Sequence, residues 1–519
     1  MRVYLIAPLP SFGSDAVLAD YLLPLDEPYA LIAAAGIATV AAFFDETFSL
    51  RLCDEIIEAV DFEDPSEVIC ISMNVSQAVR GIQIARRFRA MGRTVIMGGA
   101  HVSLAPEMFD GEADCLVIGE FEPIATTVIN DLRAGTLLPR YQGAKADLAT
   151  SPKPRWDLYR NDRAISGVVQ TSRGCPFECN FCDVIQYLGR VQRHKPPECV
   201  IAELQQLYEL GYRSVNMSDD NFTVYRQRTR TLLQALIAWN GQDGREPMQF
   251  STQMSIDIAR DEDLLGMCNQ AGMRTAFVGI ETSSEEALKE SLKRQNLRQD
   301  LTAQCSRIVA AGITVQSGMM LGFDSDDLSC FERQFRFAMS LPVVHLKVAV
   351  LVAPVATPLY DQLKAAGRLL DDPGQDPSSV GNYWTNIMPR NMTRAQLAEG
   401  ATWLVDALME PDNVIRRFES YAAILKPAPE LLRRPARRTY GTSGASPMLQ
   451  LIQKGAKDPG GRKVIDAVDV LAKARPEIAN DLLGALAMHL SNHILIAQQK
   501  RTRNQTAQNP ANQIIALLK

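Results

Sequence analysis

The first 135 residues alternate short apolar segments with segments of helical periodicity. The apolar segments are rich in Val, Ile and Leu and have the length of β-strands. Five strands joined by helical crossovers predict an open, parallel, doubly wound α/β sheet, whose ligand site lies at the carboxyl ends of the strands. The expected strands are residues 2–7, 49–53, 68–73, 94–98 and 115–119, and the expected helices are 30–44, 78–89 and 123–133.

A second run of alternating strands and helices extends from residue 164 to residue 350. Six such units cannot close an eight-stranded barrel, so we expect a partial (β/α)6 barrel with its active site at the carboxyl ends of the strands. The expected strands are residues 164–171, 214–218, 248–254, 275–280, 314–320 and 344–350. The expected helices centre on Leu204, Leu233, Leu265, Leu288, Ile308 and Phe335.

The remaining segments read as connectors and helices. Residues 136–163 contain three prolines and no clear period, which predicts a linker that is either functional or wrapped along a neighbouring domain. Residues 351–426 predict a helical extension, with helices at 394–409 and 413–425. Residues 427–519 predict an exposed connector up to residue 458, followed by C-terminal helices at 464–473 and 478–496. The connector carries Arg433, Arg434, Arg437 and Arg438 among prolines.

Composition excludes several classes of protein. Hydrophobic residues make up 46% and charged residues 22% of the 519 positions, as in an ordinary globular protein. The formal charge of -6 argues against a nucleic-acid binder. Ten scattered cysteines and the lack of a visible secretory leader predict the reducing cytoplasm. The longest apolar run, residues 30–44, is too short for a transmembrane segment, although a membrane-associated substrate stays open.

The loop after the first strand of the barrel carries the most specific chemistry. Cys175, Cys179 and Cys182 form a C-x3-C-x2-C pattern, whose short spacings let several thiolates reach one metal centre. Three thiolates satisfy three irons of a [4Fe-4S] cluster and leave the fourth iron free for another ligand. A zinc site and buried thiols are the alternatives. Because zinc usually takes four ligands and no further Cys or His is suitably spaced, the pattern favours the cluster.

Polar residues follow other strands of both predicted sheets. In the barrel, Asp219, Asp220 and Asn221 follow the second strand and Glu281 ends the fourth; helix capping or an ion pair is the simpler role. We expect Arg190, Arg193 and Lys195, after the cysteine loop, to form a solvated face rather than an anion site. In the first sheet, adjacent glycines would let the backbone approach a large flat ligand, although turn chemistry explains any single position. The strand-end positions there are Ser72, Asn74, Ser76, Gly98, Gly99, His101, Ser103, Gly119 and Glu120.

The cysteine loop closely resembles the radical S-adenosylmethionine (SAM) superfamily, including the Ser-Arg-Gly before the first cysteine and the aromatic Phe181 before the last. The resemblance implies that the three cysteines bind a [4Fe-4S] cluster. It also implies a SAM site formed by Phe181, by Asp219, Asp220 and Asn221 beside the amino and carboxylate groups, and by Glu281 near the ribose.

The Gly-Gly-x-His-x-Ser and Gly-Glu segments resemble the cobalamin-binding domain fused to one class of these enzymes. The resemblance implies that the nine strand-end positions of the first sheet form a cobalamin site. No histidine stands in a D-x-H-x-x-G setting, so the usual histidine ligand to cobalt is missing. His101 has two equally plausible roles: it contributes to the cofactor loop, or it is a loop histidine whose ring hydrogen-bonds to the backbone.

With its helical extension, the chain is similar to hopanoid C-2 methylases. The resemblance implies a C-methyltransferase acting at an unactivated carbon of a lipophilic or natural-product substrate, a hopanoid being the most specific candidate. It further implies an electron donor such as a flavodoxin or ferredoxin. One alternative is an oxidative cyclase or rearrangement enzyme, similar to the anaerobic magnesium-protoporphyrin ester cyclases. Another is a non-catalytic corrinoid or cluster carrier, which would need no SAM site.

Overall fold

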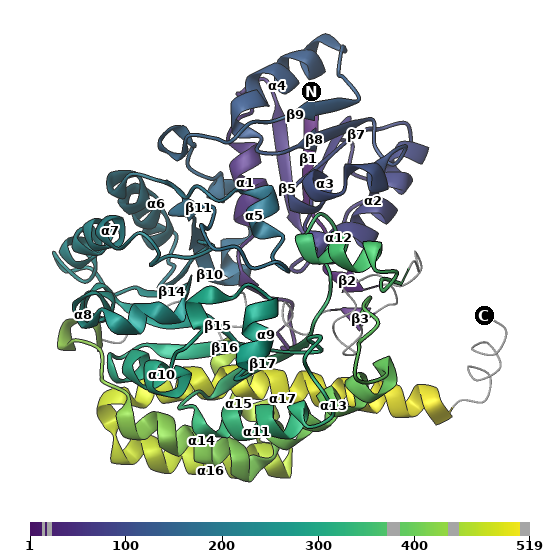
Figure 1. The fold of residues 1–519 in the computed structure, drawn as a ribbon. Helices are drawn as coiled ribbons and strands as arrows, with labels where there is room; N and C mark the ends of the chain where they lie inside the picture. The colour runs from purple at the N-terminus through teal and green to yellow at the C-terminus, as the bar shows by residue number, and fades with distance from the viewer. Residues whose placement is uncertain (13–15, 18–22, 371–384, 434–445, 509–519) are drawn as a thin grey trace.

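The computed structural model describes residues 1–12, 16–17, 23–370, 385–433 and 446–508. Figure 1 shows an N-terminal sheet at the top, a second sheet in the middle and the C-terminal helices along the bottom. Among the helices of the described ranges, none combines the length and apolar composition needed to cross a membrane.

The N-terminal sheet has the strand order of a flavodoxin-like fold. All neighbouring strands are parallel and follow the order β5-β1-β6-β7-β8-β9. The first five strands in this order confirm the predicted doubly wound sheet. The sixth, β9, lies in the segment predicted as a linker, so the sheet continues beyond residue 135. The strands are β1 (Arg2–Ala7), β5 (Ser49–Asp54), β6 (Val68–Ser72), β7 (Thr94–Gly98), β8 (Cys115–Ile118) and β9 (Arg140–Gln142).

Helices cover both faces of this sheet, and buried side chains of the strands form two core clusters against them. Within α2, for example, Ile84, Ala85 and Phe88 are buried at the spacing of one helical face. Gly135 ends α4 in the left-handed conformation that glycine adopts most easily. The helices are α1 (Ala35–Ala41), α2 (Ala78–Ala90), α3 (Ala100–Leu104) and α4 (Ala125–Ala134).

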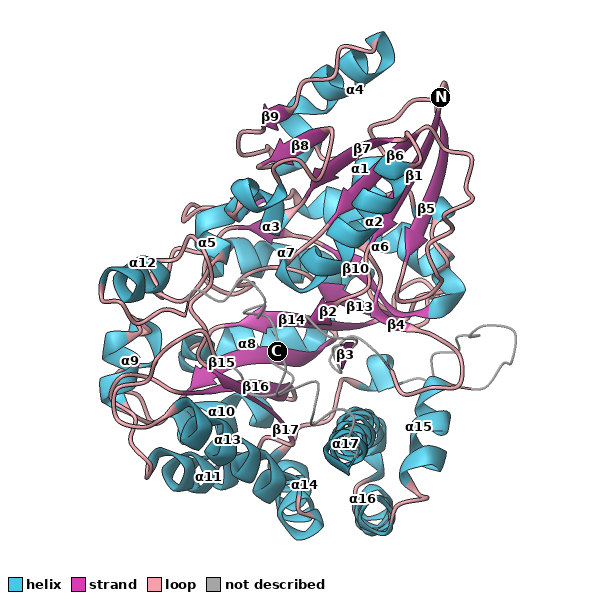
Figure 2. Ribbon diagram, turned by 90° about the vertical axis from the view of Figure 1, so that its right-hand side faces the viewer, coloured by secondary structure: helices cyan, strands magenta, loops and turns pink. Residues whose placement is uncertain are grey.

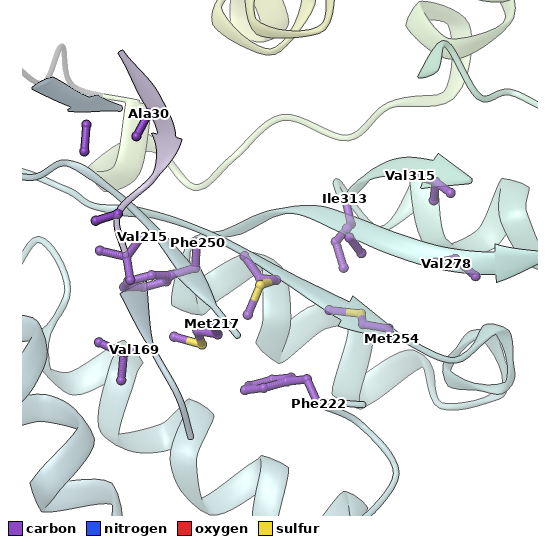
Figure 3. Close-up of a cluster of buried hydrophobic side chains, with 14 of the residues drawn as sticks. Ala30, Val169, Val215, Met217, Phe222, Phe250, Met254, Val278, Ile313 and Val315 are labelled. Carbon is purple, nitrogen blue, oxygen red and sulfur yellow. The ribbon is translucent and has the colours of Figure 1, made fainter. Parts of the chain in front are cut away.

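The predicted helix over residues 30–44 is wrong in its first part. Residues Ala30–Ile32 form a strand, β4, and the helix α1 is shorter than expected. β4 pairs in parallel with β10 (Ala164–Val169) of the second sheet, where Ala30 stands opposite Ala164. Figure 3 shows Ala30 in the same buried cluster as Val169 and Val215. The apolar run contains both a strand and a helix, and periodicity alone does not separate a short buried strand from a helix.

The second sheet confirms the predicted partial barrel and adds β4 at its edge. Its parallel strands follow the order β17-β16-β15-β14-β13-β10-β4. The other strands are β13 (Ser214–Met217), β14 (Gln249–Met254), β15 (Met273–Glu281), β16 (Thr314–Leu321) and β17 (His345–Val350). The helices are α6 (Pro197–Glu209), α7 (Arg226–Trp239), α8 (Glu262–Ala271), α9 (Glu285–Glu290), α10 (Leu301–Ala310) and α11 (Cys330–Ser340).

Side chains of the barrel strands alternate between a packed face and a more open face. In β15, Ala276, Val278 and Ile280 are buried in the hydrophobic core, whereas Phe277 and Gly279 are only partly buried. This period of two is what a sheet with helices on one side requires. The inner face of the partial barrel therefore stays accessible beside the cysteine loop.

The C-terminal region is helical, as predicted, but its connector is not wholly exposed. Leu451 of α15 is buried, and α15 packs on α17, so the expectation of an exposed connector is wrong there. Arg433 ends a short 3-10 turn, whereas Arg434, Arg437 and Arg438 lie outside the described residues. The helices are α12 (Pro358–Ala365), α13 (Arg394–Met409), α14 (Pro411–Ile424), α15 (Pro447–Gly455), α16 (Pro459–Ala474) and α17 (Ala479–Gln508).

Polar contacts fasten the long helix α17 to the barrel. The guanidinium of Arg274, in β15, lies 2.8 Å from the carboxylate of Asp481. The amide of Asn492 donates to Nδ1 of His345, in β17, over 3.1 Å. Figure 2 shows α17 nearly end-on, between β17 and α15. The C-terminal helix α17 therefore packs against the strands of the barrel and helps to stabilise them.

We expect this packing to weaken in mild acid, because burial lowers the pKa of His345 to about 3 and that of His489, in α17, far below its usual value. An unfolded histidine titrates near pH 6.5, so between that pH and pH 3 the unfolded state binds more protons and stability falls as the pH falls. His345 alone should cost about 2 kcal/mol at pH 5 relative to pH 7.5. The free energy of opening of α17, measured by hydrogen exchange at both pH values, should show this loss. His345→Gln should remove about half of the difference, since His345 and His489 contribute similarly; an unchanged difference would contradict the assignment.

Candidate active site

The cysteine loop is held tightly between β10 and the short strand β12 (Arg193–His194). The strand β11 (Ser172–Arg173) pairs with β12 immediately before the first cysteine. Gly174 has a φ of +96°, and a Cβ at this position would lie 2.8 Å from the carbonyl oxygen of Val191. Only glycine fits such a turn without strain. The entry to the loop is therefore constrained by its backbone.

The three cysteines lie in one partly buried loop, and their thiols are close enough to interact. Burial raises the pKa of Cys175 and raises that of Cys182 to about 12, and both thiols interact electrostatically with Cys179. Within the described ranges, no three His, Cys, Asp or Glu side chains are placed to hold one metal ion. The assignment of these three thiols to a [4Fe-4S] cluster therefore stays a prediction. Six of the other cysteines are buried as small hydrophobic residues.

The Asp-Asp-Asn segment after β13 braces the cysteine loop. The carboxylate of Asp219 accepts from the backbone N–H groups of Thr171 (2.7 Å) and Ser172 (3.0 Å) and from the Ser172 hydroxyl (2.8 Å). Asp220 accepts from the N–H of Gly174 over 2.7 Å, and burial raises its pKa to about 6. Because these carboxylates already have partners in the protein, their contact with SAM stays a prediction.

The amide of Asn221 also has a partner in the protein, since it donates to the hydroxyl of Ser255 over 3.1 Å. The backbone oxygen of Asn221 accepts from the side chain of Gln192 at 2.8 Å. Asn221 thus joins the segment after β13 to the residues after β14, and its role beside SAM likewise stays a prediction.

Glu281 is paired with a lysine that the sequence analysis did not identify. Its carboxylate lies 2.6 Å from Nζ of Lys293, which is also 6.0 Å from the centroid of the Phe181 ring. Burial acts to lower the pKa of Lys293, but Glu281 and Cys179 outweigh it, so the pKa is raised. The simpler reading of Glu281, as partner of a cation, describes its contact. A role beside the ribose of SAM stays a prediction.

A cavity of about 350 Å³ lies where the ends of the N-terminal strands meet the barrel. Its N-terminal wall includes five of the nine predicted positions: Ser72, Gly98, Gly99, Gly119 and Glu120. Apolar residues of α1, of the turn that follows it and of α4 also line the cavity: Ile37, Val40, Phe43, Ile129 and Leu132. Residues of the barrel complete it: Val168, Gln170, Arg173, Tyr187, Lys195 and Ser218.

The other four predicted positions serve the loops instead of lining this cavity. Asn74 caps a 3-10 turn by accepting from the N–H of Ser76 over 2.9 Å. The hydroxyl of Ser103 accepts from the N–H of Gly119 and donates to the oxygen of Gly99, both over 2.8 Å. The buried ring of His101 stacks edge-on against Phe109 at 5.8 Å. These contacts fit turn chemistry.

Gly99 shows why glycine is needed at the cavity wall. Its φ is +103°, and a Cβ would lie 2.5 Å from the carbonyl oxygen of Met73. The backbone of one strand end therefore packs directly on the next. The close approach of a ligand to the Gly-Gly pair stays a prediction.

An ion-pair network joins the N-terminal domain to the cysteine loop. Glu120, only 2% exposed, binds Arg173 (2.8 Å) and Arg193 (2.6 Å). Arg173 also binds Glu122 over 2.6 Å. Because Arg173 lies two residues before Cys175, Glu120 holds the start of the cysteine loop against the first sheet.

The expectation of a solvated face for the cations after the loop is wrong for two of the three. Arg193 belongs to the network, and Lys195, 7% exposed, pairs with the buried Glu203. Both cations have buried acidic partners: Glu120 is 73 residues from Arg193, whereas Glu203 is eight residues from Lys195 and lies on the following helix, α6. Arg190, with a side chain 56% exposed, is solvated as expected and pairs with Glu178.

The sequence and the fold of this chain are similar to those of known radical SAM proteins and methyltransferases. The Radical SAM superfamily model matches residues 169–338. An uncharacterised methyltransferase of Synechocystis sp. is 34% identical over 82% of this chain and 79% of its own length. The hopanoid C-2 methylase of Rhodopseudomonas palustris is 31% identical over 70% of this chain and 72% of its own length. The radical SAM methyltransferase TsrM of Kitasatospora setae, solved with cobalamin and a [4Fe-4S] cluster, has a TM-score of 0.59 at 15% identity and covers 92% of this chain and 99% of TsrM.

Proposed function

Since this chain belongs to the radical SAM methyltransferases, we propose that it uses cobalamin to methylate an unactivated carbon of a lipophilic small molecule. The observation that carries the proposal is the cavity between the sheets, which reaches both the glycine-rich strand ends and the side chain of Arg173 beside the cysteine loop. A methyl carrier and a radical source must act on the same substrate, so their sites must lie close together.

The residues around the cavity fit a corrinoid. Open α/β sheets bind ligands at the carboxyl ends of their strands, where Ser72, Gly98 and Gly99 lie here. The apolar part between α1 and α4 suits a flat heteroaromatic group, such as the base of a corrinoid. The described lining includes no histidine, and His101 packs on Phe109. We therefore propose that no imidazole of the protein ligates the cobalt.

The protein's own part is to hold and orient these groups. Cys175, Cys179 and Cys182 would bind the cluster, and Asp219 keeps Thr171 and Ser172 in place before them. When bound, the cluster supplies the electron that cleaves SAM, and the corrinoid carries the methyl group.

The name of one relative supports the substrate class that we propose. The hopanoid C-2 methylase similar to this chain acts on a hopanoid by its name, so we propose a lipophilic, polycyclic substrate. We also propose a flavodoxin or ferredoxin as electron donor, and the cytoplasm as the compartment. All ten cysteines are free thiols, which suits a reducing compartment.

Isotope labelling tests the reaction type. The reduced enzyme is incubated with SAM that carries a labelled methyl group and with an organic extract of cells that lack the gene. We expect label in one product, and 5′-deoxyadenosine and S-adenosylhomocysteine in roughly equal amounts, because one SAM is used as radical source and one as methyl donor. A product without label and without S-adenosylhomocysteine would reject methylation and favour the cyclase.

A further inference from the structure

The segment from Glu290 to Asn296 contacts the cysteine loop along its middle. The backbone N–H of Asn180 donates to the oxygen of Ser291 over 3.1 Å, and the Asn180 amide donates to the oxygen of Glu290 over 2.9 Å. The side-chain amide of Gln295 donates to Sγ of Cys179 over 3.7 Å. The segment from Glu290 to Asn296 thus supports the loop that would bind the cluster, in addition to the contacts from Glu120.

Lys293, in the same segment, places a positive charge beside the thiols. Its ammonium group is paired with Glu281 at 2.6 Å and lies near the ring of Phe181, the residue before Cys182. The side chain is only 13% exposed, so water screens the charge weakly. Lys293 interacts electrostatically with Cys179 and Cys182.

The backbone around this pair is strained at two positions. Glu281 has a φ of 64° and Leu292 a φ of 55°, both in the left-handed region that side chains rarely adopt. The amide of Gln334 holds Glu281 by donating to its backbone oxygen over 2.7 Å. A Cβ at Gly279 would lie 2.7 Å from Nζ of Lys293. Strain that several contacts maintain is typical of functional sites.

We propose that Lys293 and Gln295 are positioning residues that raise the reduction potential of the cluster required by the proposed function. A cluster gains one negative charge when an external one-electron donor reduces it, and no bond or proton need move. A nearby cation and an N–H···S hydrogen bond both stabilise the more negative, reduced form. The two residues thereby ease the electron transfer that precedes SAM cleavage.

A redox titration of the anaerobically reconstituted full-length protein, followed by electron paramagnetic resonance without SAM, tests this inference. Lys293→Met and Gln295→Leu should each lower the ratio of reduced to oxidised cluster at a fixed potential by about tenfold, which is a shift of about 59 mV. Lys293→Arg keeps the charge and should stay near the unsubstituted protein. The exposed neighbour Arg294, paired with Glu178 at 3.3 Å, provides the control Arg294→Gln, which should change the ratio little.

The outcomes separate this inference from the proposed function. If the unsubstituted protein binds no iron, the proposed function fails. If Lys293→Met and Gln295→Leu bind a full complement of iron and titrate like Arg294→Gln, only the role of Lys293 and Gln295 is overturned. If Lys293→Met does not assemble a cluster, the redox titration of Gln295→Leu tests the inference instead. This substitution removes the hydrogen bond to Cys179 at similar side-chain volume and unchanged charge, and a titration like that of Arg294→Gln would overturn the inference.

Discussion

Replacing Cys175, Cys179 or Cys182 by alanine should abolish iron binding and SAM cleavage. The three thiols share one constrained loop, and each would hold a different iron, so the loss of one leaves that iron without a protein ligand. The protein reconstituted with iron and sulfide should lose its charge-transfer absorbance in each variant. Formation of 5′-deoxyadenosine should fall to background.

Two cysteines outside the loop are matched controls for this loss. Cys199, at the start of α6, is partly exposed, and Cys268, in α8, is buried. Cys199→Ala and Cys268→Ala should keep the iron content and absorbance of the unsubstituted protein. If Cys199 proved necessary while Cys179 proved dispensable, the ligand assignment would be wrong.

Glu120→Ala should produce the largest loss of stability at the junction of the two sheets. The substitution leaves the guanidinium groups of Arg173 and Arg193 partly buried with one carboxylate fewer between them. Breaking a buried pair from one side costs about 3–5 kcal/mol, because the remaining charge stays desolvated. Denaturant unfolding should show this loss, and hydrogen exchange of the backbone at Arg173 and Gly174 should accelerate.

The control for this prediction is an ion pair on the outer surface of the same domain. Glu112 binds Arg86 over 2.6 Å, and the side chain of Arg86 is 67% exposed. Glu112→Ala should cost at most about 1 kcal/mol, since exposed pairs contribute little. Equal stability of Glu120→Ala and Glu112→Ala would show that the network does not hold the domains together.

Most of the fold could be predicted from the sequence because its signals are local. Hydrophobic periodicity located the strands of both sheets, and the rule for parallel sheets placed the site at their carboxyl ends. The strand β4 was missed because its three residues become a strand only through pairing with β10. β9 is equally short and follows a proline-containing turn, so it resembled a linker.

Only those parts of the site whose residues are close together in the sequence could be predicted. The three cysteines, with their short spacing, are the main example. The roles of Glu120 and Glu281 depend on Arg173, Arg193 and Lys293, which are distant in sequence from their acidic partners. A Gly-Glu pair at a strand end does not reveal whether its carboxylate faces a cofactor or an arginine.

The pairing of β4 with β10 constrains the order in which the molecule can assemble during translation. Ala30 leaves the ribosome long before Ala164, its partner across the two strands. At typical synthesis rates the delay is on the order of ten seconds, during which the N-terminal sheet can form but β4 has no neighbour. Leu31 and Ile32, which remain exposed even in the finished barrel, would be available to chaperones throughout this interval. The nascent chain therefore carries an unpaired apolar segment until the first strand of the barrel emerges. Faster elongation through residues 33–163 should shorten the time for which this segment is exposed.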